Sequence, residues 1–426
     1  MKKIAVVGGG ITGVTTAYAL AKKGFSVTLF ERHRYAAMET SFANGGQLSA
    51  SNAEVWTHHS TILKGLKWML KSDAPLLVNP KPSWHKISWF MEFMLSMKDY
   101  ERNTIETAKL AIAAREHLFA WAQAEGIDFN LKKQGILHIY RDKKGFDHAG
   151  RVSALLAKGG LPRQAVTPAE MKVIEPTLAG DYYGGYFTES DSTGDIHKFT
   201  TGLALAAQRM GVRTLYDQDV TSVSTDNKIA TIKVAHSNAP ATVHTFDGVV
   251  VCAGVASKQF ATQLGDRVNI YPVKGYSITV NLNDAESKAG APQVSLLDDE
   301  TKLVTSRLGV DRFRVAGTAE FNGYNKDIRA DRIKPLVDWV QQCFPKINTR
   351  SVVSWAGLRP MMPNMMPKVG RGNAANVFYN TGHGHLGWTL SAVTADMVAD
   401  TVTHHMASVN QTPKPQYTLG QLHPAK

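Results

Sequence analysis

The order of apolar and polar residues at the start of the chain predicts a strand, a helix and a second strand. Residues 4–7 form a continuous apolar run, β-branched at three of four positions, which is typical of a strand buried on both faces of a parallel sheet. Apolar residues then recur at helical spacing until Gly24, and residues 26–30 predict the next strand. The apolar face of the predicted helix consists of Val14, Ala17, Tyr18 and Ala21.

Three glycines between the first strand and the helix have the spacing G-x-G-x-x-G, and an acidic residue ends the second strand. Gly8 permits a tight turn, Gly10 lets the backbone approach a pyrophosphate, and Gly13 lets the helix pack against the strand. The helix N-terminus offers unpaired N–H groups to phosphates, and Glu31 can accept hydrogen bonds from ribose hydroxyls. Because all these parts occur together, the stretch predicts a site for an ADP-containing dinucleotide, carrying either nicotinamide or flavin.

The rest of the chain alternates between helical and strand patterns without an internal repeat or a second dinucleotide unit. A single tightly held cofactor is therefore the economical interpretation. Helices are expected at residues 104–126, at about 198–210, and after the glycine-rich loop TGHGHLG near the end of the chain. Strand patterns occur at residues 136–140, 213–215, 220–223, 249–251, 273–280, 302–315 and 377–380.

The composition is that of an ordinary globular protein, with 426 residues of which 43% are hydrophobic and 20% charged. The formal net charge is +12, but the basic residues are scattered and no nucleic-acid motif appears, so attraction to anionic substrates or anionic lipid is favoured over nucleic acid. No stretch is long and apolar enough to span a bilayer. Since residue 4 already lies in a predicted strand, we expect no signal peptide and a cytoplasmic location.

The cysteines and histidines do not suggest a metal site. Cys252 and Cys343 form no spaced set, which argues against a disulfide framework and against a cysteine-ligated metal. His383 and His385 lie two residues apart, but no nearby acid or third ligand completes a site. We therefore expect no metal.

Residues 61–98 carry an unusual apolar pattern. On a helical wheel Lys64, Lys67 and Lys71 lie opposite an apolar face, which indicates a basic amphipathic helix, and residues 87–97 are apolar nearly all round. These segments either pack on the protein's own core or lie on an anionic membrane, and the pattern alone leaves both open. The apolar face of the first segment contains Ile62, Leu63, Leu66, Met69 and Leu70.

Several motifs together carry a resemblance that covers nearly the whole chain. The N-terminal unit, ETSFANGGQLS, VVVCAGVAS, GLRPMMPNMMPKVG and NTGHGHLGWTLS resemble the FAD-dependent D-amino-acid oxidase superfamily, and within it the bacterial D-amino-acid dehydrogenase (small subunit) type. This resemblance favours flavin over nicotinamide, so FAD is the expected cofactor.

The resemblance also implies a mixed α/β (α+β) fold with two interleaved domains. A Rossmann-like FAD-binding domain is expected at residues 1–56, 189–268 and 351–426. A substrate domain built on a mostly antiparallel sheet with flanking helices is expected at residues 57–188 and 269–350.

Site residues follow from the same resemblance. Those assigned to FAD are Gly8, Gly10, Gly13, Glu31, Arg32, Thr40, Ser41, Asn44, Gly45, Gly46, Gln47, Val220, Ala253, Gly254, Gly382, Gly384, His385, Leu386, Gly387, Trp388 and Thr389. Arg359 matches the arginine that binds the substrate carboxylate, a task that suits its charged fork. Tyr276 matches a position near flavin and substrate, where its hydroxyl would add a hydrogen bond to the carboxylate or would simply be a buried structural group.

The reaction implied is oxidative deamination of a D-amino acid by hydride transfer from Cα to flavin N5, giving a 2-oxo acid and ammonia. Oxidation of a secondary amine such as glycine, sarcosine or a D-proline derivative is the alternative. A third hypothesis is a non-catalytic FAD-binding protein of a membrane complex. Arg359 argues against this hypothesis, because an arginine that binds a carboxylate has no purpose without a substrate. The expected electron acceptor is a quinone or another carrier, reached by peripheral contact of residues 61–98 with the cytoplasmic face of the inner membrane.

Overall fold

The N-terminal elements form as the apolar pattern predicts. The computed structural model describes residues 1–58, 75–235 and 240–408. Strand β1 (Lys3–Val7) pairs in parallel with β2 (Ser26–Phe30) and with β13 (Gly248–Val251), and α1 (Ile11–Lys22) connects the first two. The sheet has the order β19-β20-β13-β1-β2-β9, which places β1 in its interior. Its other strands are β9 (Arg213–Leu215), β19 (Lys368–Arg371) and β20 (Val377–Thr381).

This first sheet is covered on both faces, which explains why residues 4–7 of β1 are all apolar. Ile4 and Val6 belong to a core formed with α1, α7 (Ile196–Arg209) and α11 (Gly387–Ser408). Ala5 and Val7 point the other way, into a core shared with a three-stranded antiparallel sheet. That small sheet consists of β10 (Asp219–Thr225), β11 (Ala230–Ala235) and β12 (Thr242–Phe246).

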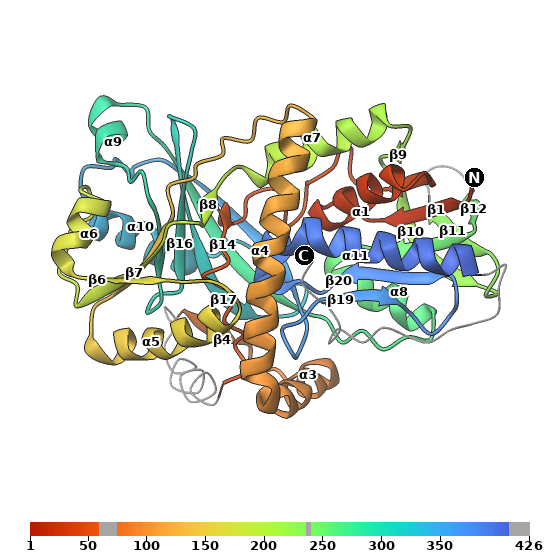
Figure 1. The fold of residues 1–426 in the computed structure, drawn as a ribbon, viewed down its shortest axis with the longest axis horizontal. Helices are drawn as coiled ribbons and strands as arrows, with labels where there is room; N and C mark the ends of the chain where they lie inside the picture. The colour runs from red at the N-terminus through yellow and green to blue at the C-terminus, as the bar shows by residue number, and fades with distance from the viewer. Residues whose placement is uncertain (59–74, 236–239, 409–426) are drawn as a thin grey trace.

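The other half of the molecule is a nine-stranded sheet (Figure 1). Its order is β18-β14-β17-β16-β15-β5-β7-β6, with β4 paired to β17. Only β15–β5 and β17–β4 are parallel among its pairs, so the expected mostly antiparallel sheet is confirmed. Its strands are β4 (Leu76–Val78), β5 (Ile136–Tyr140), β6 (Gln164–Val166), β7 (Gly184–Thr188), β14 (Tyr271–Asn281), β15 (Ser295–Asp298), β16 (Leu303–Leu308), β17 (Arg312–Phe321) and β18 (Val352–Met361). The apolar alternation at residues 302–315 therefore belongs to two strands rather than one.

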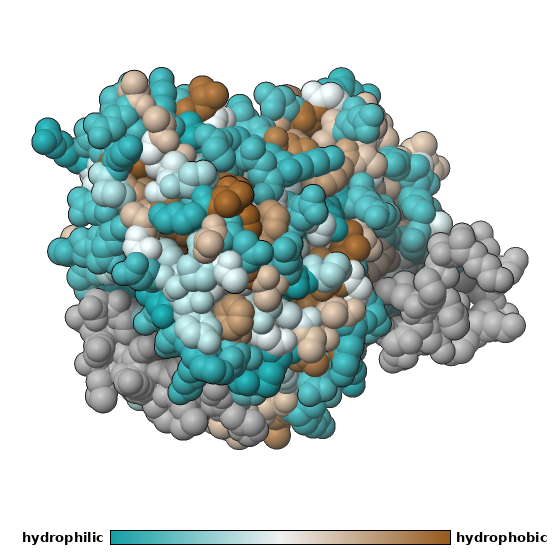
Figure 2. Space-filling view, turned by 60° about the vertical axis from the view of Figure 1, so that its left-hand side comes forward, coloured by the Kyte–Doolittle hydropathy of each residue, from teal (hydrophilic) through white to brown (hydrophobic). Residues whose placement is uncertain are grey.

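Short helices surround this sheet, and α10 (Ala330–Cys343) packs on one face through Leu336, Trp339 and Val340. The remaining helices of this half are α5 (Lys143–Lys158), α6 (Pro168–Ile174) and α9 (Ala285–Gly290), while α8 (Ser257–Gln263) follows β13. Strands β3 (Gln47–Leu48) and β8 (Ser192–Thr193) form a small separate pair. Figure 2 shows a predominantly hydrophilic surface with small, separate apolar areas.

Two segments lie on a different side of the expected domain boundaries. Strand β18 was expected in the cofactor domain, but it pairs with β14 at the edge of the nine-stranded sheet. Helix α4 (Tyr100–Ala124) was expected in the substrate domain, but Leu118, Trp121 and Ala122 pack in the same core as α1 and α11. In Figure 1 this long helix crosses the molecule between its two halves. Both differences have the same cause. The domain to which a segment belongs is decided by its backbone pairing and its apolar packing, and not by its place in the chain.

Helix α3 (Trp84–Leu95) resolves the second apolar segment into two faces. Trp89 and Phe93 are buried against β14, β17 and β18, whereas Trp84, Met91 and Leu95 are 78%, 52% and 71% exposed. The interpretations of this segment as core and as an exposed apolar surface therefore each describe one side of the helix. The basic amphipathic segment at 61–71 lies outside the described residues. No helix among the described residues is long and apolar enough to cross a membrane.

A rigid turn joins β15 to β16 and depends on one buried carboxylate. Asp298 accepts hydrogen bonds from Arg141 (2.6 Å), from the Trp339 indole N–H (2.8 Å) and from the backbone N–H groups of Glu300 and Thr301. The Asp298 side chain is fully buried. Removing it would leave several donors of the turn, of β5 and of α10 without an acceptor.

We expect Asp298→Ala to lower the free energy of unfolding by about 3 kcal/mol, because it breaks a buried, charged network. Denaturation by urea, followed by tryptophan fluorescence, measures this change. Glu300→Ala is the matched control on the same turn, since its side chain is 69% exposed and lies 3.8 Å from Arg141. It should cost less than about 1 kcal/mol, and an equal loss in both variants would contradict the assignment.

Candidate cofactor and substrate site

One cavity of about 1220 Å³ lies where the two large sheets meet. It is larger than the usual pocket for a single small ligand, and its position between two structural units is common for cofactor sites. Every residue predicted from the sequence for FAD or substrate lines it, except Gly13. These residues come from the β1–α1 turn, the loop after β2, the ends of β13 and β20, and β14 and β18 of the other sheet.

The three glycines of the β1–α1 turn have three different reasons to be glycine. Gly8 has φ +110°, and a Cβ there would lie 2.6 Å from the Cys252 carbonyl oxygen. A Cβ on Gly13 would lie 1.7 Å from the carbonyl oxygen of Gly8, so this glycine permits packing within the turn. A Cβ on Gly10 would meet only the Ser41 hydroxyl, at 3.5 Å. Gly10 is thus open on the cavity side, which is what close approach of a pyrophosphate requires.

Glu31 ends β2 and belongs to the same turn. Its two carboxylate oxygens accept hydrogen bonds from the backbone N–H groups of Gly9 (2.6 Å) and His33 (2.9 Å). Each oxygen retains a lone pair, so the carboxylate can also accept ribose hydroxyls from the cavity. The sequence analysis missed Gly9, whose Cβ would lie 2.8 Å from Glu31 Oε2, because this contact exists only after the turn has folded.

Arg32 lies at the rim of the cavity, where Glu39 and Lys326 join the two halves. Its guanidinium pairs with Glu39, which also binds Lys326 from the loop after β17, at 2.6 Å. Burial raises the pKa of Glu39, but the hydrogen bonds from Lys326 and His33 and the charge of Arg32 outweigh it and bring the pKa to about 2. The carboxylate is therefore ionised throughout the physiological range and ties the cofactor side of the cavity to the substrate side.

The loop after β2 is held between the two sheets. Thr40 donates to the Leu358 carbonyl at 2.8 Å, the Ser41 hydroxyl accepts from the Ile11 N–H at 3.0 Å, and Asn44 Oδ1 accepts from the Gly46 N–H at 2.9 Å. Residues of this loop can therefore orient a cofactor while the loop is itself held by both halves.

Gly45 and Gly46 approach β16 closely. Their Cβ atoms would lie 2.5 Å from Val304 Cγ2 and 2.7 Å from Ser306 Oγ, respectively. We expected these two glycines to let the loop backbone lie close to a ligand. The structure shows that they let it lie close to β16, so the protein itself accounts for at least part of this requirement. Gln47 extends the connection, because its side-chain amide donates to Ser295 and to the Leu296 carbonyl.

The glycine loop before α11 forms the opposite wall. His385 stacks on Trp56 with ring centroids 5.1 Å apart, and its Nε2 lies 3.3 Å from the Asn52 carbonyl. Burial lowers the pKa of His385, the hydrogen bond with the Asn52 carbonyl opposes this, and the charges of Arg359 and Lys302 add to the lowering. The resulting pKa is about 4, so the ring is neutral at physiological pH. The N-terminus of α11 follows this loop directly and can stabilise negative charge in the cavity.

Two other predicted residues of this wall have structural contacts. Trp388 packs edge-on against Phe129, in the core beneath the cavity. Thr389 accepts a hydrogen bond from the Ser49 N–H at 3.3 Å. His383, once weighed as a metal ligand, places Nε2 3.0 Å from the Thr394 hydroxyl.

Arg359 is a buried cation without a carboxylate partner in the described part of the chain. It donates to the carbonyl oxygens of Thr318 (2.8 Å) and Gly317 (3.4 Å), and burial alone lowers its pKa, to about 10. Gly275 is required opposite it, since a Cβ there would lie 2.3 Å from the guanidinium. A charged group in such a place favours a bound anion, and a carboxylate matches its fork.

Tyr276 does not contribute its hydroxyl to this site, which corrects one of the two expected roles. The side chain lies on the other face of β14 from Gly275, in the core with α10, and is 1% exposed. Its hydroxyl donates to Glu320 at 2.7 Å. The alternation of side chains along the strand explains the difference, because adjacent residues point to opposite faces.

Many other cavity residues also escaped the sequence analysis, and four of them bear on the substrate side. Thr318 has φ +53°, a conformation that no pattern in the sequence signals, and its buried hydroxyl oxygen has no hydrogen-bond partner among the described residues. Glu54 and Trp56 follow the loop ETSFANGGQLS and both line the cavity. They are two residues apart in SNAEVWT, and in an extended segment this spacing would have predicted that both side chains point to the same side. Lys302 comes from the β15–β16 turn, whose nearness to the cavity only the folded sheet reveals.

These features define one cavity that suits a dinucleotide on one side and an anionic group on the other. A family model described as "FAD dependent oxidoreductase" (DAO) matches residues 3–401. The chain belongs to this family and is an enzyme that uses FAD as its cofactor.

Comparisons with individual proteins agree. The chain is 61% identical over 402 residues to "D-amino acid dehydrogenase 3" of Mesorhizobium japonicum, covering 94% of this chain and 97% of that protein. It is 38% identical over 420 residues to a D-amino acid dehydrogenase of Paramagnetospirillum magneticum, covering 96% of both chains. Among solved structures, glycine oxidase from Geobacillus kaustophilus aligns with a TM-score of 0.74 at 19% identity, over 95% of both chains, which shows the shared fold.

We expect Gly10→Val to lower FAD affinity at least about 10-fold while the cofactor-free protein keeps its melting temperature within a few degrees. The new side chain would fill the space that a pyrophosphate needs, yet it meets only a hydroxyl of the protein. Titration of the cofactor-free variant with FAD measures this effect. Gly24→Ala is the control for glycine removal outside the cavity. No atom lies within 4 Å of its Cβ position, but its φ of +84° is strained for alanine, so this variant should lose stability without losing FAD affinity. Normal FAD binding by Gly10→Val would contradict the placement of the pyrophosphate.

Proposed function

We propose that this protein is a D-amino-acid dehydrogenase. It oxidises a D-amino acid at Cα, and water converts the resulting imino acid to a 2-oxo acid and ammonia. The observation that carries this proposal is Arg359, a buried guanidinium that faces the cavity and has no carboxylate partner among the described residues. The names of the two relatives at 61% and 38% identity support the same activity.

The protein's contribution is to hold the substrate in position. FAD, when bound, supplies the two-electron acceptor that receives the hydride from Cα. Arg359 binds the α-carboxylate through its fork, and the carbonyls of Gly317 and Thr318 hold the guanidinium in place. The neutral His385, stacked on Trp56, covers the site without adding charge. Positioning of this kind, together with the electrostatics of the α11 N-terminus, suffices for hydride transfer without a strong general base.

The test is the visible spectrum of the purified holoenzyme during anaerobic addition of D-alanine or L-alanine. We expect the D-isomer alone to bleach the flavin. Arg359→Lys should retain FAD but lower kcat/KM for D-alanine about 100-fold, because a single ammonium replaces a bidentate, charged contact. Bleaching by glycine, sarcosine or D-proline instead of D-alanine would replace the proposal with a secondary-amine enzyme.

We further propose that the enzyme lies on the cytoplasmic face of the inner membrane and passes its electrons to a quinone. Two observations support this proposal. The outward face of α3 exposes Trp84, Met91, Met94 and Leu95 in one helix, an arrangement that suits contact with lipid. The net charge of +12 favours an anionic surface.

We expect Leu95→Glu to reduce co-sedimentation with anionic liposomes at low salt several-fold, since a charge on the apolar face opposes insertion. Val173→Glu is the matched control, because Val173 is an 81% exposed apolar residue on α6. Equal binding by both variants, or recovery of the unmodified enzyme only in the supernatant, would contradict membrane contact through α3. Reoxidation of the reduced holoenzyme by a soluble quinone and not by air tests the acceptor.

A further inference from the structure

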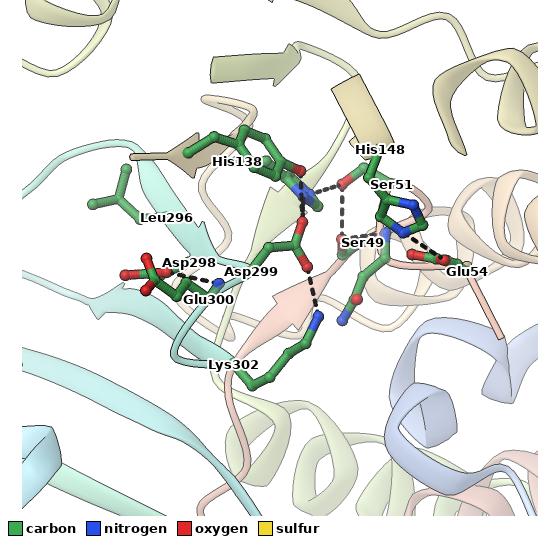
Figure 3. A network of polar contacts seen from close by, with 12 residues as sticks. Ser49, Ser51, Glu54, His138, His148, Leu296, Asp298, Asp299, Glu300 and Lys302 are labelled. Carbon is green, nitrogen blue, oxygen red and sulfur yellow. Dashed lines mark hydrogen bonds and ion pairs between the residues drawn. The ribbon is translucent and has the colours of Figure 1, made fainter. Parts of the chain in front are cut away.

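The cavity that Arg359 lines is also lined by a group of charged residues, Glu54, His148, Asp299 and Lys302, which we call the charged chamber. Figure 3 shows these four residues and their polar contacts. These residues come from the segment after the cofactor loop, from α5 and from the β15–β16 turn. None of them was assigned to FAD from the sequence. Because the chamber opens into the same cavity as Arg359, it is accessible to the part of a substrate that extends away from the carboxylate.

Lys302 and Asp299 neutralise one another in this chamber. Lys302 Nζ lies 2.8 Å from Asp299 Oδ1, and Asp299 Oδ2 accepts from the Tyr140 hydroxyl at 2.5 Å. The turn that carries them is fixed by Asp298, and Lys302 itself has φ +57°, a conformation that non-glycine residues rarely adopt. Strained residues held by a rigid surrounding are concentrated at functional sites.

Glu54 is the chamber's remaining negative charge. Its Oε1 accepts the Tyr100 hydroxyl at 2.7 Å and lies 3.3 Å from His148 Nε2, which is charged only when protonated. No described residue donates to its Oε2. Burial opposes ionisation, but the hydrogen bond from His148 and the charge of Lys302 hold the pKa of Glu54 below its usual value. Glu54, which lines the cavity, therefore favours its ionised form.

His385 lies between this chamber and Arg359. The charges of both Arg359 and Lys302 act on the His385 ring, whereas burial alone shifts Arg359. His385 also contacts the backbone of Asn52, two residues before Glu54, and stacks on Trp56, two residues after it. A substrate whose carboxylate binds Arg359 would thus send a long side chain past His385 and Trp56 to reach Glu54.

From this arrangement we propose that Glu54 selects D-amino acids with a long cationic side chain, such as D-lysine or D-arginine. This inference rests on the proposed function, because it requires the α-carboxylate at Arg359. The substrate cation would donate to Glu54 Oε2, for which the described residues offer no donor, and would add a positive charge beside a carboxylate whose described cationic neighbour Lys302 is also paired with Asp299. Glu54 is a specificity residue and takes no part in hydride transfer.

The first experiment compares D-lysine with D-norleucine, its isostere without the ammonium, on the unmodified holoenzyme. We expect kcat/KM to be at least about 10-fold higher for D-lysine, since a charge-assisted hydrogen bond is lost in D-norleucine. Equal values, or a preference for D-norleucine or D-glutamate, would overturn the inference. If D-alanine and D-norleucine are oxidised normally, the proposed function stands even when this inference fails. If no D-amino acid is oxidised, the proposed function itself fails.

The second experiment uses Glu54→Gln, which keeps an acceptor for Tyr100 but removes the charge. We expect the ratio of kcat/KM for D-lysine to that for D-norleucine to fall about 10-fold, mainly through KM for D-lysine. Glu300→Gln removes the same charge from the β15–β16 turn at a side chain that is 69% exposed, and should change the ratio less than about 2-fold. An unchanged ratio in Glu54→Gln would contradict the role of Glu54. The comparison on the unmodified enzyme decides the question should this variant fail to fold.

Discussion

A buried guanidinium that no carboxylate of the described chain neutralises is the constraint around which the substrate side of this enzyme is organised. Burying an arginine is costly unless hydrogen bonds and a counter-charge compensate it. Here two carbonyls of β17 satisfy part of the guanidinium, and Gly275 leaves room for it. In the proposed function the α-carboxylate of the substrate supplies the missing counter-charge, so an arginine already held in place by the fold would favour carboxylate binding.

Placing that cation beside the cofactor requires the two sheets to meet at a fixed distance. The loop after β2 does this, because it is bonded to α1 on one side and to β15, β16 and β18 on the other. The Glu39–Lys326 ion pair adds a second connection at the rim. The cofactor loop is therefore also the joint between the halves, which couples cofactor binding to the shape of the substrate site.

The cavity itself combines two regions with different electrostatics. Around Arg359 the wall is cationic and His385 is neutral, which suits a carboxylate. Farther on, the rigid turn held by Asp298 presents the Lys302–Asp299 pair opposite Glu54. A substrate that carries a carboxylate at one end and a cation at the other would match both regions. The outward apolar face of α3 is on the surface and does not line this cavity.

The sequence by itself determined the dinucleotide unit, because its glycine spacing, apolar run and terminal acid all act within 31 residues, where local geometry decides structure. The residues that it assigned to cofactor and substrate through the resemblance line the cavity, with the exception of Gly13. Tertiary structure alone decided the rest. The register of β14 against its neighbouring strands decides whether the Tyr276 side chain points toward the cavity or toward α10. Strand β18 belongs to the second sheet because it pairs with β14, about 80 residues away in the sequence. Glu54 and Lys302 line the same cavity only because the fold brings two distant segments of the chain together. Contacts of this kind produce no pattern of apolar and polar residues from which they could be predicted.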